Sequence, residues 1–144
     1  VAADERDIVR TRSNARGEDV YLYRLQMSQA NVRALFLEYL NAANELRRAP
    51  RFYNTLTSNC TTIVFELARL IAPALPMDYR LLLSGHFAEY IYDLHGLTPG
   101  HRYAELQALG HINERALASD ASGDDFSMSI RQGVPGVPAD EVSP

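Results

Sequence analysis

The only cysteine of the chain, Cys60, is the residue whose setting most favours chemistry. It follows three residues whose side chains can cap a helix, Thr57, Ser58 and Asn59, and it opens a run of helical apolar spacing that extends to Ile71. Free N–H groups and the macrodipole at the amino end of a helix favour a thiolate. A thiolate attacks carbonyl carbons, so Cys60 is a candidate nucleophile for acyl transfer; the alternative is a small apolar residue buried in a first helical turn.

Three residues just before the cysteine are candidates for substrate contacts. Asn59 carries an amide that can donate a hydrogen bond to an oxyanion. Tyr53 and Asn54 belong to an aromatic connector over residues 51–56 and would line a cleft beside Cys60. Their structural alternatives are packing for Tyr53 and a turn hydrogen bond for Asn54.

A fourth candidate for a substrate contact, Arg80, lies beyond the helix predicted over residues 60–71. Its guanidinium could bind a carboxylate or phosphate of a substrate, or it could form an ion pair with Asp78 or Glu89.

A cysteine nucleophile usually works with a general base, and His86 is the candidate for that base within the chain. It is expected at the start of a helix, where the helix dipole disfavours the charged imidazolium.

The residue inventory indicates neither a metal site nor a cofactor. The four histidines, His86, His95, His101 and His111, and the single cysteine show none of the paired spacings typical of zinc ligands. One cysteine cannot form an intramolecular disulfide, and the absence of lysine excludes a Schiff base. We therefore expect no metal and no cofactor.

Composition narrows the class of protein and its partners. The 144 residues are 47% hydrophobic and 22% charged, which is ordinary for a globular domain. The formal net charge of -4 argues against nucleic acid as a partner. No apolar run approaches the roughly 20 residues needed to cross a bilayer.

The spacing of apolar residues predicts a mostly α fold with one short β element. A strand is expected over residues 20–25, with Val20 and Leu22 on one face and Tyr21 and Tyr23 on the other. Helices are expected from the cap Ser28 to about residue 48, over 60–71, from 84 or 85 to a stop at 96, and then over 103–109 and 112–119. A last short helix is expected to follow the capping residues Asp124 and Asp125 and to end at Arg131. The helix over 60–71 is apolar nearly all round and is expected to be central.

One domain is predicted over residues 1–132, followed by a flexible tail over 133–144 that is rich in glycine and proline. The chain opens at Val1 with a polar, arginine-rich stretch and without a helix cap before it. We therefore expect a fragment of a larger domain that begins upstream, with the upstream segment of the parent protein as a partner.

Five segments of the chain carry a resemblance to a known family. The central one is FYNTLTSNCTT over residues 52–62, and the others lie at 4–7, 18–23, 75–85 and 126–131. Together they resemble the Lnb-type N-terminal periplasmic domain, a bacterial family. The resemblance implies a relation to permuted papain-like thiol enzymes, of which this chain would be the cysteine-bearing helical half of an α+β domain. It also implies that Cys60 is the nucleophile, and that the protein is periplasmic or anchored in the inner membrane on the periplasmic side.

In permuted papain-like proteins the histidine base precedes the cysteine, whereas no histidine precedes Cys60 here. The base would then lie upstream of Val1, on a partner chain or at a later histidine, and the chain alone would be inactive. The function expected is acyl transfer or amide or ester hydrolysis on a peptide, lipoprotein or cell-wall-derived substrate. The alternative is a non-catalytic helical interaction or ligand-binding module, and a fragment that exposes apolar surface would form a homodimer.

Overall fold

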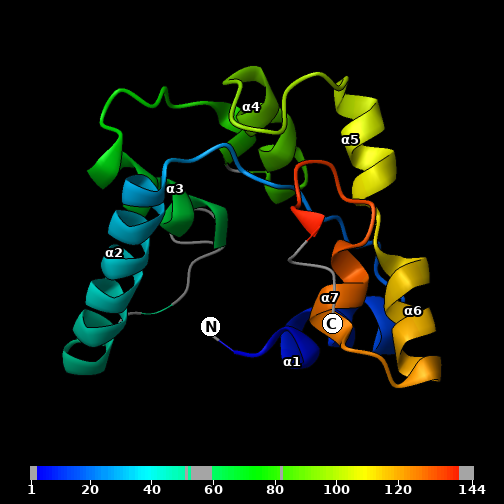
Figure 1. Cartoon of the computed structure of the whole chain (residues 1–144). Helices are drawn as coiled ribbons and strands as arrows, with labels where there is room; N and C mark the ends of the chain where they lie inside the picture. Colours follow the sequence, from blue (N-terminus) through cyan, green and yellow to red (C-terminus); the bar gives the residue numbers. More distant parts are fainter. Residues whose placement is uncertain (1–2, 51, 53–59, 82, 140–144) are drawn as a thin grey trace. The chain divides into compact units, whose positions relative to one another are not determined.

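Helices make up almost all the regular structure of the described residues, which in this computed structural model are 3–50, 52, 60–81 and 83–139 (Figure 1). The mostly α class predicted from the sequence is confirmed. Contacts divide the chain into two compact units, Val1–Leu25 with Leu97–Pro144 (unit 1) and Gln26–Gly96 (unit 2). That residues 1–132 fold as one domain stays a prediction.

Unit 2 begins with the long helix α2, Gln29–Arg48. The Oγ atom of Ser28 accepts a hydrogen bond from the backbone N–H of Asn31 at 3.2 Å, so the predicted cap is confirmed. Arg47 and Arg48 occupy the last turn, where the helix dipole favours cations.

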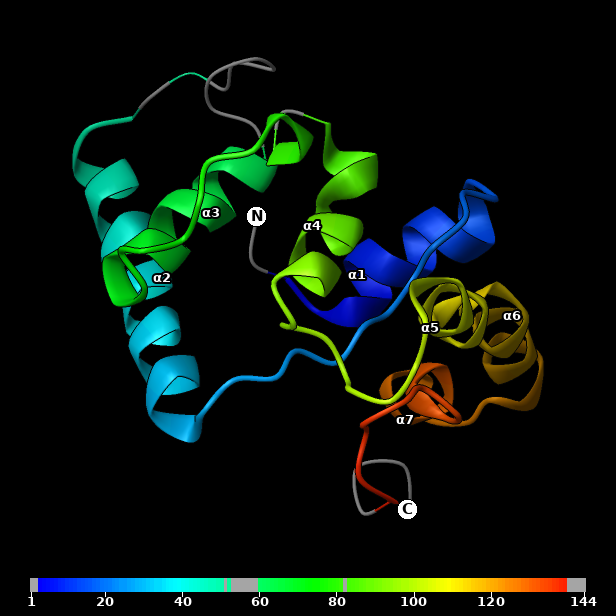
Figure 2. The same ribbon diagram turned by 90° about the horizontal axis from the view of Figure 1, so that it is seen from above.

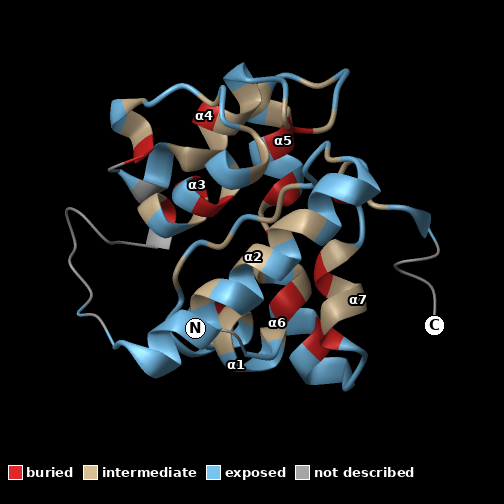
Figure 3. Ribbon diagram, turned by 90° about the vertical axis from the view of Figure 1, so that its left-hand side faces the viewer, coloured by how far each residue is buried: buried red, intermediate tan, exposed pale blue. Residues whose placement is uncertain are grey.

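Helix α3, Cys60–Ile71, packs against α2 and buries one face (Figure 3). Thr61, Phe65 and Leu67 are buried, whereas Ile63 and Leu70 are 39% and 63% exposed. The prediction that α3 is central is therefore wrong. The reason is that α3 is covered on one side only, so apolar residues on its outer side remain in contact with water.

Two short 3-10 turns, η2 (Tyr79–Leu81) and η3 (Ser84–His86), lead into α4, Phe87–Asp93. The helix end that the sequence predicts at Gly96 involves two residues. His95 adopts a positive φ of 56°, and the N–H of Gly96 returns to the carbonyl of Ile91 at 2.9 Å. A side chain at Gly96 would meet Ile91 Cγ2 at 2.8 Å, which accounts for glycine at this position.

Unit 1 opens with α1, Glu5–Arg10, which continues into the π-helical turn η1, Thr11–Ala15. The Asp4 side chain accepts a hydrogen bond from the N–H of Arg6 at 2.9 Å and caps α1. The expectation that no cap precedes the charged stretch is therefore wrong. The segment is mostly polar because α1 buries little surface, and its apolar residues Ile8 and Val9 are only partly buried.

The predicted short strand is present as an extended segment with two isolated antiparallel bridges, Tyr21 to His111 and Leu25 to Leu97. Val20 and Leu22 pack against the core of unit 1, while the rings of Tyr21 and Tyr23 stack 6.5 Å apart. The segment passes beside α5, Tyr103–Gly110 (Figure 2). The two predicted faces are thus confirmed.

Two further helices belong to unit 1, α6 at Asn113–Ser122 and α7 at Phe126–Arg131. Asp125 caps α7 by accepting from the N–H of Met128 at 3.0 Å, as its sequence indicates. The core consists of Ile112, Ala116, Phe126 and Ile130. Burial of these side chains, at roughly 25 cal/mol per Å² of apolar surface, is the main stabilising contribution in unit 1.

The predicted tail begins with packed residues. Val134 is 5% exposed, and the hydroxyl of Thr98 donates to the carbonyl of Pro135 at 2.9 Å. The described part of the tail, residues 133–139, therefore belongs to unit 1. Residues 140–144 lie outside the described residues.

The first and last helices of the described chain, α1 and α7, lie side by side in unit 1 (Figure 1). Both carboxylate oxygens of Glu5 accept from the Arg131 guanidinium, at 2.7 and 2.8 Å, and one also accepts from Ser127. These hydrogen bonds, those from Arg131 above all, lower the pKa of Glu5 below its ordinary value.

Gly110 provides a test of how closely the extended segment approaches α5. The N–H of Leu22 donates to the Gly110 carbonyl at 2.8 Å, and a side-chain carbon at Gly110 would lie 2.6 Å from the Leu22 carbonyl oxygen. Gly110→Ala should therefore lower the free energy of unfolding by about 2 kcal/mol in urea titrations. Gly85→Ala is the control, because nothing lies within 4 Å of its added carbon; equal stability of the two variants would contradict the close approach.

The Glu5–Arg131 pair predicts a pH dependence. Because the folded-state pKa of Glu5 is depressed, its contribution is complete above the ordinary carboxyl pKa, about 4.3, and is lost as the pH falls through the lower folded value. Glu5→Gln should cost about 1 kcal/mol at pH 7, since both side chains stay partly exposed. Urea titrations from pH 7 to about pH 2 should show this difference shrinking, and a constant difference would refute the assignment.

Candidate functional site

The candidate site begins at the first residue of α3. Cys60 opens this helix of 12 residues, as its sequence predicts. Its side chain lies outside the described residues, as do Tyr53, Asn54 and Asn59 and the caps expected at 57 and 58. The structure therefore describes the backbone that carries the cysteine and the elements that hold it.

An aromatic cluster fixes the first turns of α3. Thr61, next to the cysteine, is 5% exposed. One turn later the ring of Phe65 meets the ring of Tyr90 edge to face, with centroids 6.4 Å apart and planes at 77°. Leu81 of η2 completes this buried cluster. Helix α3 is thus held from its second turn by η2 and α4.

Arg80 connects η2 to α4 by charge. Its guanidinium donates to both carboxylate oxygens of Asp78, at 3.1 and 2.9 Å, and to Asp93 at 2.6 Å. The same group lies over the ring of Tyr90, 5.6 Å from the centroid. Its side chain is only 14% exposed, although that of Asp93 is 55% exposed.

The hydrogen bonds between Arg80 and Asp78 keep this pair ionised. The hydrogen bonds from Arg80 lower the pKa of Asp78, and those to Asp78 and Asp93 raise the pKa of Arg80. Burial raises the pKa of Tyr90, whose hydroxyl donates to the carbonyl of Pro76 at 2.7 Å. Tyr90 is therefore a neutral donor that holds the segment before η2.

Of the predicted contact residues, Arg80 is the one whose side chain the structure describes. The pairing with Asp78 that its sequence allowed is confirmed, while Glu89 lies instead beside His86, 3.3 Å from Nδ1. A role of Arg80 in binding a substrate stays a prediction. The guanidinium would have to serve that role while its donors face two carboxylates.

Sequence reasoning missed Asp93 and Tyr90. Glu89 and Asp93 are four residues apart on α4 and lie one turn apart on one face, so spacing alone did not distinguish them as partners of Arg80. A tyrosine on a short helix is ordinarily expected to place its hydroxyl at the surface, whereas Tyr90 is 2% exposed and its hydroxyl is bonded within unit 2.

Histidines in both units lie beside carboxylates. In unit 1, His111 Nε2 is 2.9 Å from Asp19, and its ring lies 5.1 Å from that of Tyr21. His101 lies 3.9 Å from Glu105 at the start of α5. No group of three or more metal-ligating side chains is found among the described residues.

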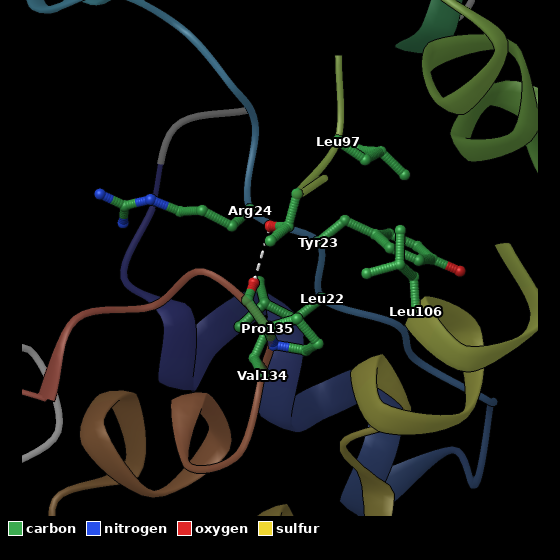
Figure 4. A pocket seen from close by; sticks show the side chains of 8 residues that line it. Leu22, Tyr23, Arg24, Leu97, Leu106, Val134 and Pro135 are labelled. Carbon is green, nitrogen blue, oxygen red and sulfur yellow. Dashed lines mark hydrogen bonds between the residues drawn. The ribbon is translucent and has the colours of Figure 1, made fainter. Parts of the chain in front are cut away.

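A shallow depression lies in unit 1, with about 170 Å³ of empty space that includes open solvent (Figure 4). Its lining includes Leu22, Leu106 and Val134, and the hydrogen bond from Thr98 to Pro135 crosses it. Ligand pockets usually measure about 300–1,000 Å³, so this hollow is too small for one.

Comparison with known proteins identifies a family. The family model described as the Lnb N-terminal periplasmic domain matches residues 1–85, more than half of the chain. The match includes α2, α3 and η2 and ends before α4. A search of curated proteins and a search of solved structures found no match. Among the described residues no helix is long and apolar enough to cross a membrane.

Arg80 can be tested as a structural residue. Arg80→Gln should destabilise the chain, because it removes the bidentate pair with Asp78 and the cation over Tyr90. The change in unfolding free energy should clearly exceed that of Arg48→Gln, an exposed arginine at the end of α2, for which we expect at most about 0.5 kcal/mol. Thermal unfolding followed by circular dichroism measures both. Equal midpoints would leave Arg80 without a structural role.

Proposed function

Because the chain belongs to the Lnb N-terminal periplasmic domain family, we propose that it is the cysteine-bearing part of a papain-like thiol enzyme domain. The chain is periplasmic. The observation that carries the proposal is the position of its only cysteine at the first residue of a 12-residue α-helix. There, the positive end of the helix dipole stabilises a thiolate.

The proposed reaction is acyl transfer through a thioester. The thiolate of Cys60 attacks the carbonyl carbon of an ester or amide, and the C–O or C–N bond breaks after the tetrahedral intermediate. The leaving alcohol or amine takes a proton from a general acid. Water or an amine then attacks the thioester, gives up its proton to the same group and releases the thiolate.

The family resemblance implies a histidine base that precedes the cysteine. Within unit 2 the alternative is His86, whose Nδ1 faces Glu89 at 3.3 Å, a pairing that can fix the tautomer of an imidazole. The proposed substrate is a peptide, a lipoprotein or a cell-wall-derived molecule. Asn59, Tyr53, Asn54 and Arg80 remain the proposed contacts to it.

The rival function, a non-catalytic interaction module, is favoured by a different observation. The apolar face of α2 is exposed along its length, with Phe36 at 61% and Val32 at 51%. Such a face supports binding to another protein whether or not Cys60 reacts. If Cys60→Ser in the full-length protein abolishes the phenotype that the protein confers on the cell, the enzyme is favoured. An unchanged phenotype would favour the interaction module.

The thiolate proposal predicts a pH profile for alkylation. Since the chain has one cysteine, iodoacetamide reports on Cys60 alone. The alkylation rate of the folded chain should rise with a midpoint below about 7.5, because the helix terminus stabilises the thiolate. Mass spectrometry of samples quenched between pH 5 and pH 10 measures the rate.

The same chain in concentrated urea is the control, because unfolding removes the helix. Its midpoint should return to about 8.5, the ordinary value of a free thiol. Identical alkylation midpoints in the folded and unfolded chains would contradict the proposal. A folded chain that is not alkylated at any pH would do the same, since the thiol would then be inaccessible.

A further inference from the structure

The strongest unexplained feature of the chain is the uncovered apolar face of α2. None of its 20 residues is buried. The exposed face carries Val32, Phe36, Tyr39 and Leu46, each at least 40% exposed. A helix of this length spans about 30 Å, so the exposed stripe is long enough for an extended contact.

Helix α2 packs against α3, and its half-buried residues lie on a different side from the exposed stripe. Its half-buried residues are Ala34, Leu35, Glu38 and Ala42. These lie on one flank of the apolar stripe and on the polar face beyond it, as their helical spacing requires. The fold of unit 2 thus covers one flank of the stripe and leaves its centre exposed.

The residues of the exposed stripe follow a heptad spacing. Val32, Phe36, Tyr39, Ala43 and Leu46 are separated by four, three, four and three residues. This is the alternation of a and d positions by which one helix packs along another. We call these five residues the α2 seam. A continuous seam of this kind fits a helix better than a flat surface or an extended peptide.

Positive charge borders the α2 seam on one flank. With Phe36 and Ala43 at a positions, Arg33, Leu40 and Arg47 occupy the three e positions, and both arginines are exposed. The g positions on the other flank hold Leu35 and Ala42. Charges at e positions select partners because they lie beside the flank of the facing helix.

We propose that the α2 seam binds an amphipathic helix of a partner polypeptide whose own seam is bordered by acidic residues. Glutamates beside that seam would face Arg33 and Arg47. A second copy of this chain fits less well. In an antiparallel pair the same flanks face each other, so Arg33 of one copy would lie near Arg47 of the other.

The experiment uses two synthetic helical peptides as probes. Both have three heptads with leucine at a and d; one has glutamate at e and g, the other lysine. Like charges keep each peptide from pairing with itself. Fluorescence anisotropy of the labelled peptides, titrated with the full chain at low salt, should show the glutamate peptide binding about tenfold tighter or more.

Matched variants assign the binding to the seam. Phe36→Ser should abolish it, while Leu37→Ser, at a similarly exposed apolar residue outside the seam, should leave it unchanged. Arg33→Glu combined with Arg47→Glu should reverse the preference toward the lysine peptide. Arg48→Glu makes the same charge change at an f position and should not. Circular dichroism of each variant checks that the helices persist.

Four outcomes would overturn the proposal. They are no binding of either peptide, no preference between them, a dimer in sedimentation velocity that Phe36→Ser disrupts, and seam-dependent binding to phosphatidylglycerol vesicles without binding to the peptides. The dimer would assign the seam to a second copy, and vesicle binding would assign it to a lipid surface. All four are independent of the chemistry of Cys60, because no step of the test uses the thiol.

Discussion

The packing of unit 2 depends on the ring of Tyr90. Phe65 meets it edge to face, Phe87 stacks against it, and Arg80 lies over it, while its hydroxyl is bonded to Pro76. Each contact contributes only about 1 kcal/mol, but together they join α3, η2 and α4 at one buried side chain. Helix α3, which carries the backbone of the only cysteine at its first residue, is held through this ring from its second turn.

Unit 1 is held together by elements that are far apart in the sequence, because α1 packs against α7. The charge pair between α1 and α7 is partly exposed, and such pairs contribute little. The apolar core around Ile112 and Ile130 therefore supplies most of the stability. The ion pair instead fixes which side of α1 faces α7, since Glu5 and Arg131 make a bidentate contact that tolerates little rotation.

Features encoded by neighbouring residues could be predicted from the sequence. Ser28 and Asp125 cap helices where expected, and Cys60 opens α3, because capping and apolar spacing act within a few residues. Features set by tertiary contacts could not. The pairing of Arg80 with Asp93 and the exposure of Ile63 depend on which elements meet, and a sequence pattern does not specify that. The same holds for any cleft beside the cysteine.

Helix α2 shows why amphipathic spacing predicts a helix better than it predicts packing. The moment of a helix defines an apolar direction, but the covering element contacts only part of it. Here the flank that carries Leu35 is half-buried, whereas Phe36 remains exposed. A helix with few buried contacts contributes little stability of its own, so anything that binds it preferentially stabilises it by mass action. Because α2 packs on α3, such binding would also stabilise the helix that carries Cys60.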